Sequence, residues 1–131
     1  MATTANAYIG TDHYKVTITA GKNVVIADEG EDNGGKNLGP NPHELLLASL
    51  GACTCATVRM YADRKQMKLE EVKVNLNLEW DEENKTTNIT REIKFVGELT
   101  HEEHAKLLAI ADKCPIHKLL SNPVKINTQM I

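Results

Sequence analysis

The sequence lacks an excess of positive charge and has few cysteines. Its 15 Lys and Arg are outnumbered by 18 Asp and Glu, which gives a net charge of -3. The basic residues are scattered along the chain, so we expect no nucleic-acid-binding surface. Three cysteines in 131 residues cannot form a fully paired disulfide framework, which leaves reactive thiols, metal ligands or buried thiols. The length is that of one domain, and we expect a single domain over residues 1–131.

Targeting signals and membrane spans are also lacking. Residues 1–15 do not have the charged start, apolar run and small-residue cleavage site of a secretory signal. The most apolar stretch, residues 45–58, contains Ser49, Thr54 and Thr57 and falls short of the length needed to cross a bilayer. We therefore expect a cytoplasmic protein with no membrane partner.

Alternating apolar and polar residues predict two β-hairpins. The expected strands cover residues 13–20, 23–29, 69–80 and 86–99. The fourth strand places Ile89, Arg91, Ile93 and Phe95 on its inward face. A further strand is expected at residues 124–130.

Two helices complete the pattern. After a Gly- and Asn-rich loop, a long helix is expected to begin at Pro42, with Asn41 as its cap, and to run to about Met67. Thr100 and Glu103 have the spacing of a capping box at the start of a second helix. The order of elements predicts an α+β fold with antiparallel sheets around a long central helix.

The long helix is apolar on every side between Glu44 and Val58. A surface helix would show a polar stripe, so this helix is expected to be buried all round. One small domain cannot easily surround a helix on every face, whereas two copies can. The sequence therefore predicts a homodimer that packs around this helix.

The cysteines suggest redox chemistry. Cys53 and Cys55 lie about 200° apart around a helix, so they cannot both face one site and at most one is expected to be a working thiol. Cys114 precedes Pro115 at a turn, where a thiol can approach a partner. One thiol on a rigid helix and a second on a turn suit a peroxide-reducing pair, in which a sulfenic acid condenses to a disulfide. For each cysteine, a packing role is the alternative.

A metal site is not expected. Cys114 and His117 have the spacing of metal ligands, but a structural zinc ion needs four, and only Cys53 and His43 could supplement them. We therefore predict no metal and no cofactor.

Two segments carry a resemblance to a known family. GPNPHELLLASLGACTCATVRMYADRK and the later KCPIHKLL resemble the OsmC/Ohr superfamily, the osmotically inducible protein C and organic hydroperoxide resistance proteins. The resemblance implies an intertwined homodimer with active sites at the subunit interface. It also implies thiol-dependent reduction of organic hydroperoxides or hydrogen peroxide in oxidative-stress defence. By position, Cys53 would attack the peroxide, Cys114 would resolve to a disulfide, and a dithiol would reduce it.

The sequence departs from the superfamily's peroxidases around the long helix. His43 follows the Asn-Pro pair where those proteins usually have a glutamate, and Glu44 comes one residue later. No arginine precedes Arg59, so Lys36 is the nearest cation in the preceding loop. His43, Glu44 and Lys36 are therefore the expected supporting residues. The alternative function is a non-catalytic relative that binds a small apolar ligand at the dimer interface or acts as a redox sensor.

Overall fold

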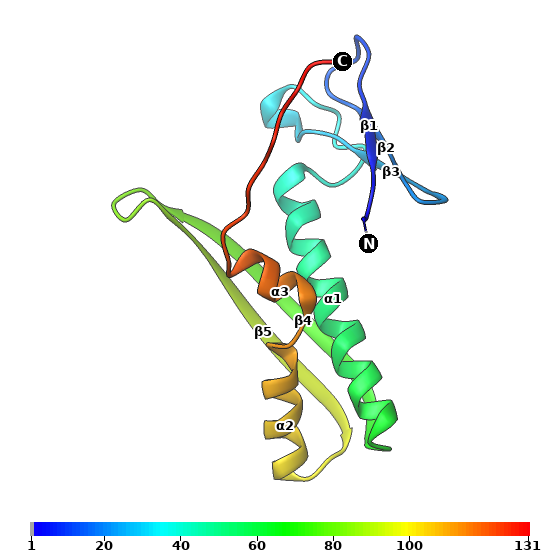
Figure 1. Cartoon of the computed structure of the whole chain (residues 1–131), viewed down its shortest axis with the longest axis vertical. Helices are drawn as coiled ribbons and strands as arrows, with labels where there is room; N and C mark the ends of the chain where they lie inside the picture. The colour runs from blue at the N-terminus through cyan, green and yellow to red at the C-terminus, as the bar shows by residue number, and fades with distance from the viewer. Residues whose placement is uncertain (1) are drawn as a thin grey trace. The chain divides into compact units, whose positions relative to one another are not determined.

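The computed structural model describes residues 2–131 and has the expected α+β composition, with antiparallel sheets and one long helix (Figure 1). The chain divides into two compact units. The N-terminal unit ends at Leu46 and the C-terminal unit spans Leu47–Ile131. Each unit is described by itself below.

The N-terminal unit contains an antiparallel three-stranded sheet in the order β1-β2-β3. Its strands are β1 (Asn6–Tyr8), β2 (Val16–Ala20) and β3 (Asn23–Ala27). The predicted hairpin is confirmed, with Val16 opposite Ala27. Gly21 in its turn has a φ of 63°, a conformation that glycine adopts without steric cost. The sequence did not predict β1, which is too short to show a period.

A buried carboxylate organises the loop that follows β3. Asp28 accepts hydrogen bonds from four backbone N–H groups, those of Tyr14, Glu29, Lys36 and Leu38. Burial opposes ionisation of Asp28, but these four donors outweigh it and lower the pKa of the carboxyl group. The loop contains a short 3₁₀ helix, η1 (Glu31–Asn33).

Helix α1 (Pro42–Arg64) begins where the sequence predicted and ends before Met67. The predicted cap at Asn41 is confirmed, and it forms a capping box that was not predicted: Asn41 Oδ1 accepts from the Glu44 N–H at 2.8 Å, and Glu44 Oε1 accepts from the Asn41 N–H at 2.9 Å. At 23 residues the helix is by length and composition able to cross a membrane, contrary to the expectation from the interrupted apolar run.

The burial of α1 differs from the expected pattern. The buried residues of α1 recur every fourth position and form one stripe: Leu50, Thr54, Val58 and Ala62. The single chain therefore does not bury the helix on all sides. Val58 and Ala62 belong to the hydrophobic core of the C-terminal unit, as expected for the core helix of a soluble domain.

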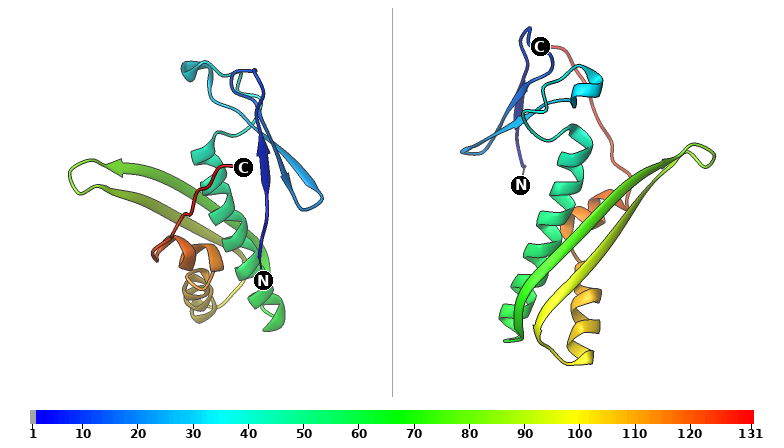
Figure 2. Two further views of the ribbon diagram at one scale, coloured as in Figure 1. Left: turned by 45° about the horizontal axis from the view of Figure 1, so that its top comes forward. Right: turned by 180° about the vertical axis from the view of Figure 1, so that it is seen from behind.

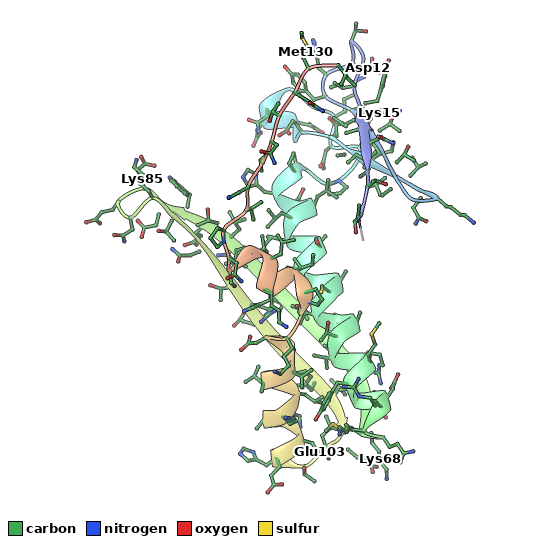
Figure 3. All side chains as sticks on the ribbon, in the orientation of Figure 1. Asp12, Lys15, Lys68, Lys85, Glu103 and Met130 are labelled. Carbon is green, nitrogen blue, oxygen red and sulfur yellow. The ribbon has the colours of Figure 1, made fainter. Side chains whose placement is uncertain are left out.

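The C-terminal unit packs helices against a long hairpin. The hairpin consists of β4 (Lys68–Asp81) and β5 (Thr86–Glu98), and is followed by α2 (His101–Ala111) and α3 (Pro115–Leu120). Figure 3 labels Lys85 at the tip of this hairpin and Lys68 at its other end. The helices lie on one face of the hairpin (Figure 2). The core joins α1, β4 and α2 through five buried residues: Val58, Ala62, Leu69, Leu107 and Ala111.

Two local predictions in this unit have different outcomes. The capping box of α2 is confirmed, because Thr100 Oγ1 accepts from the Glu103 N–H and the Glu103 carboxylate accepts from the Thr100 N–H. The predicted strand at residues 124–130 is wrong for the single chain, where this segment forms no regular structure. A strand requires a neighbouring strand to satisfy its backbone groups, and none of the described strands pairs with this segment.

Candidate functional site: a thiol pair beside a buried arginine

The fold brings together two of the three cysteines. Cys53 lies in the middle of α1, and Cys114 precedes the first residue of α3. Each of these two thiols alters the pKa of the other, so their side chains lie close together. Cys114 is 0% exposed, whereas Cys53 is partly exposed. Of these two sulfur atoms, Cys53 is thus the one that a small molecule can reach.

The surroundings of Cys114 favour its thiolate. Burial opposes ionisation, yet the pKa of the Cys114 thiol is lowered, because its sulfur accepts hydrogen bonds from Cys53 and from the backbone N–H groups of His117 and Ile116. The hydroxyl group of Thr54 is also within hydrogen-bonding reach of this sulfur. Pro115 fixes the first turn of α3, which directs these two N–H groups toward Cys114.

Cys53 shows the opposite shift. Burial raises the pKa of the Cys53 thiol, and the hydrogen bond to Cys114 together with the charge on that sulfur raises it further. The Ile116 N–H and the Thr57 hydroxyl act in the opposite direction without reversing the shift. The pair therefore loses its first proton from Cys114, and Cys53 keeps its proton as long as Cys114 is charged.

Arg91 of β5 reaches the same place from the other side of the core. Its side chain is 11% exposed and donates three hydrogen bonds: Nη1 to Thr54 Oγ1 at 3.1 Å, Nη2 to Asp112 Oδ1 at 2.9 Å, and Nη2 to His117 Nδ1 at 3.2 Å. These acceptors belong to α1, to the end of α2 and to α3. A planar guanidinium can serve several acceptors in fixed directions, which the point charge of a lysine cannot do.

The contact with Arg91 sets the tautomer of His117. Arginine has no acceptor, so His117 Nδ1 must accept the hydrogen bond and the ring carries its proton on Nε2. A pocket of about 320 Å³ lies against these two side chains. Its lining includes Leu50, Thr87, Ile89, Arg91, His117 and Leu120. This pocket thus combines apolar walls with a cation and an imidazole.

Sequence comparison identifies the family. The sequence profile of the family described as OsmC-like protein matches residues 34–129, which is most of the chain. The chain belongs to the OsmC-like protein family. A search of curated proteins found no match.

Solved structures show the same fold as this OsmC-like protein. An OsmC-like protein from Mycoplasma pneumoniae is 18% identical with a TM-score of 0.79, over 92% of this chain and 88% of that one. The organic hydroperoxide resistance protein OsmC from Legionella pneumophila is 24% identical with a TM-score of 0.67, over 92% and 89%. The organic hydroperoxide resistance protein OhrB of Bacillus subtilis is 21% identical with a TM-score of 0.62, over 91% and 90%.

The expected supporting residues lie outside the C-terminal unit. Lys36, His43 and Glu44 belong to the N-terminal unit. Glu44 caps α1, and the backbone N–H of Lys36 donates to Asp28. Both observations describe structural roles. The supporting role of these three residues toward the thiols remains a prediction.

Sequence reasoning missed Arg91, Thr54 and His117 as functional neighbours of the thiols in this OsmC-like protein. One signal was available: Arg91 is the charged residue among the apolar residues on the inward face of β5. Cys55 differs from Cys53 in that it is not among the residues that shift the pKa of Cys114.

Arg59 has a structural role that the sequence did not reveal. Nη1 of Arg59 donates to the Leu69 carbonyl at 2.9 Å, and Nη2 donates to the Glu70 carbonyl at 3.1 Å. This arginine therefore joins α1 to β4. Within residues 2–131 there is no group of three or more His, Cys, Asp or Glu side chains placed to hold a metal ion.

Proposed function

We propose that this protein is a thiol-dependent peroxide reductase in which Cys53 attacks the peroxide and Cys114 resolves the product to a disulfide. The observation that carries the proposal is that the fold brings two thiols together, one partly exposed and one buried, with Arg91 hydrogen-bonded to Thr54, the residue after Cys53. Membership of the OsmC-like family and the likeness to proteins titled as organic hydroperoxide resistance proteins support it. The substrates in this proposal are organic hydroperoxides or hydrogen peroxide.

The pKa shifts suggest how the first step proceeds. The Cys114 thiolate takes the proton of Cys53 as the Cys53 sulfur attacks one peroxide oxygen and the O–O bond breaks. Cys53 becomes a sulfenic acid, and the proton passes to the leaving alkoxide, which departs as an alcohol. Cys114, again a thiolate, then attacks the Cys53 sulfur, and hydroxide leaves as the disulfide forms. An external dithiol restores both thiols by exchange.

Arg91 takes the place of the arginine that the sequence lacks before α1. Its guanidinium donates to Thr54, one of the residues that lower the pKa of Cys114. We expect the charge of Arg91 to favour the thiolate over the thiol. It also joins the three segments that hold the pair, through Thr54, Asp112 and His117. We assign Arg91 as a positioning residue, since it acts through these neighbours.

We further propose that the working form is a cytoplasmic homodimer. Large parts of α1 are not buried by the single chain, and the extended segment after α3 exposes the apolar residues Val124 and Ile126. A second copy is the partner that would cover such surfaces with matching ones. Sedimentation velocity of the reduced protein at micromolar concentration would distinguish a dimer from a monomer.

Trapping the oxidised cysteines tests the catalytic proposal. The reduced protein is exposed for seconds to stoichiometric tert-butyl hydroperoxide, with catalase present to remove hydrogen peroxide, and is then analysed by intact mass and peptide mapping. We expect a Cys53 to Cys114 disulfide in the native protein and a trapped sulfenic acid at Cys53 in Cys114→Ser. The matched control Cys55→Ser should behave as the native protein does.

Three reduced thiols after many minutes would contradict the proposal. The non-catalytic alternative would then apply, and the 320 Å³ pocket would be the place to look for a bound apolar ligand. A disulfide that involves Cys55 would contradict the assignment of the pair.

A further inference from the structure

A second hollow of the C-terminal unit lies between α1 and the end of α2. This groove, which we call the α1–α2 groove, has a volume of about 220 Å³. Its lining includes Thr57, Tyr61, Arg64, Ile110, Lys113 and Pro115. The side chains that line it are partly apolar and partly basic, and none of the residues just named is acidic.

Positive charge gathers around one aromatic ring of this groove. The Arg64 guanidinium lies 5.5 Å from the centre of the Tyr61 ring, and the Lys65 and Lys106 ammonium groups each lie 5.9 Å from it. Lys113 adds a fourth cation to the region. Among residues 2–131, none of these four cations forms a salt bridge. Like charges held this close repel one another, and a bound anion would relieve the repulsion.

Three acidic residues of the neighbouring elements are engaged elsewhere. Asp63 pairs with Arg59 at 3.3 Å, and Asp112 with Arg91 at 2.9 Å. Glu103 caps the start of α2, at the end of that helix shown in Figure 3. The groove therefore has a local positive charge although the whole chain has a net charge of -3.

The groove is connected to the thiol pair at two points. Thr57, which lines the groove, lies one turn of α1 after Cys53 and is one of the residues that influence the pKa of its thiol. Pro115, which also lines the groove, directly follows Cys114. On α1, Thr57 and Arg64 are four and eleven residues after Cys53, which places all three on one side of the helix. A molecule in the groove would thus lie about one turn of α1 away from Cys53.

We propose that the α1–α2 groove binds the carboxylate of a small acidic thiol, which is the reductant of the Cys53–Cys114 disulfide. The inference rests on the proposed function, since it requires that this disulfide forms. Arg64 and Lys113 hold the carboxylate, and the thiol is presented to Cys53. The charge pattern selects a thiol that carries a negative charge over a neutral or cationic one.

The reduction is balanced by two thiol equivalents. The thiolate of the reductant attacks the Cys53 sulfur, the bond between Cys53 and Cys114 breaks, and Cys114 leaves as a thiolate. A second thiolate, from the same molecule or from another, attacks the outer sulfur of the mixed disulfide. Cys53 leaves as a thiolate that takes up a proton, and the reductant departs as its disulfide. Attack at Cys53 suits the hydrogen bonds that stabilise the Cys114 thiolate, because the more stable thiolate leaves faster.

A series of thiols with different charge tests the inference on the full-length protein. The disulfide is first made with diamide, so that the test does not depend on peroxide turnover. Its reduction is then followed with 3-mercaptopropionate, 2-mercaptoethanol and cysteamine, with each rate divided by the thiolate fraction of the reagent. We expect the anionic thiol to react about tenfold faster than the neutral one at low salt, and the difference to shrink as salt is added.

Two double variants test whether the preference for an anionic thiol comes from the α1–α2 groove. Arg64→Gln combined with Lys113→Gln should reduce the preference to about twofold or less. Lys94→Gln combined with Lys125→Gln removes the same charge from exposed positions elsewhere and should keep the preference. The salt dependence of the native protein provides a second test that needs no variant.

The outcomes separate the two proposals. Equal rates for all three thiols, or equal effects of the two double variants, would overturn the acidic-thiol inference and leave the peroxidase proposal standing. Failure of diamide to join Cys53 to Cys114 would overturn both. A disulfide that forms with diamide but not with peroxide would overturn the peroxidase proposal alone, and the charge preference would still decide the role of the groove.

Discussion

Replacement of Arg91 by methionine should destabilise the C-terminal unit by about 3 kcal/mol. Methionine keeps much of the apolar stem but removes the guanidinium and its three hydrogen bonds. A hydrogen bond to a charged group contributes about 1.5 kcal/mol at the lower end of the usual range. We assign that value to each of the bonds to Thr54 and His117. Asp112 is 68% exposed, so its ion pair contributes at most about 0.5 kcal/mol after solvent screening.

The assay is urea unfolding of the fully reduced protein, followed by circular dichroism. For a chain of this size, a loss of 3 kcal/mol corresponds to a midpoint lower by about 1.5 M urea. Arg91→Lys keeps the charge but not the planar guanidinium with its fixed donors. We therefore expect the free energy of unfolding to fall by about 1 to 2 kcal/mol. Lys94→Met changes an exposed position of the same strand. Its free energy of unfolding should differ from that of the native protein by no more than about 0.5 kcal/mol.

Thiol reactivity separates the electrostatic role of Arg91 from its packing role. We expect the pH midpoint for alkylation of the thiol pair to rise in Arg91→Met and to be partly restored in Arg91→Lys, because the positive charge favours the thiolate. The reasoning would be refuted if Arg91→Met and Lys94→Met had the same unfolding midpoint and the same alkylation profile. A stability loss without a change in the alkylation profile would remove only the electrostatic role.

Other parts of the chain give further predictions. The lowered pKa of Asp28 means that its ionised form stabilises the fold above the ordinary range of a carboxyl group. That contribution is lost as the pH falls through the folded-state pKa, so Asp28→Asn should flatten the acid limb of a stability curve measured between pH 2 and pH 6. Replacement of Leu107 by alanine should lower the free energy of unfolding by about 2 to 5 kcal/mol, because this side chain is 0% exposed in the core. Chemical denaturation would measure the loss. Gly97 has a φ of 151°, and a Cβ there would lie 2.1 Å from the Lys68 carbonyl oxygen. Gly97→Ala should therefore lower the thermal midpoint markedly, whereas an unchanged midpoint would show that the backbone of the hairpin can relax at this position.

Local features of the fold could be predicted because their causes are local. The capping boxes at Asn41 and Thr100 depend on residues three positions apart, and both are present in the structure. The strands of the second hairpin follow a period of two that is visible over more than ten residues. The three-residue strand β1 (Asn6–Tyr8) shows no such period. The tail after Pro123 has the composition of a strand but no neighbour in the chain to pair with.

The thiol pair could be predicted from a motif, whereas the groups that control it could not. Arg91 contacts Thr54, Asp112 and His117, which are 37, 21 and 26 residues away in the sequence. Side chains so far apart meet only through the packing of β5 against the helices. Arg91 stands among apolar residues on one face of β5, which indicated that its side chain needs a buried hydrogen-bond partner. The sequence did not indicate which residue that partner is.

Arg91 shows that a residue missing from a sequence motif can have a counterpart elsewhere in the fold. A thiol pair needs a cation that donates hydrogen bonds in fixed directions within a few ångströms, and this requirement does not specify which strand supplies it. The chain lacks an arginine before α1, yet Arg91 of β5 places a guanidinium beside Thr54, the residue next to Cys53. The loss of one sequence position therefore does not imply the loss of the interaction. What would argue against the proposed catalysis is a thiol pair whose ionisation does not depend on Arg91, and the alkylation profiles of Arg91→Met and Arg91→Lys measure that dependence.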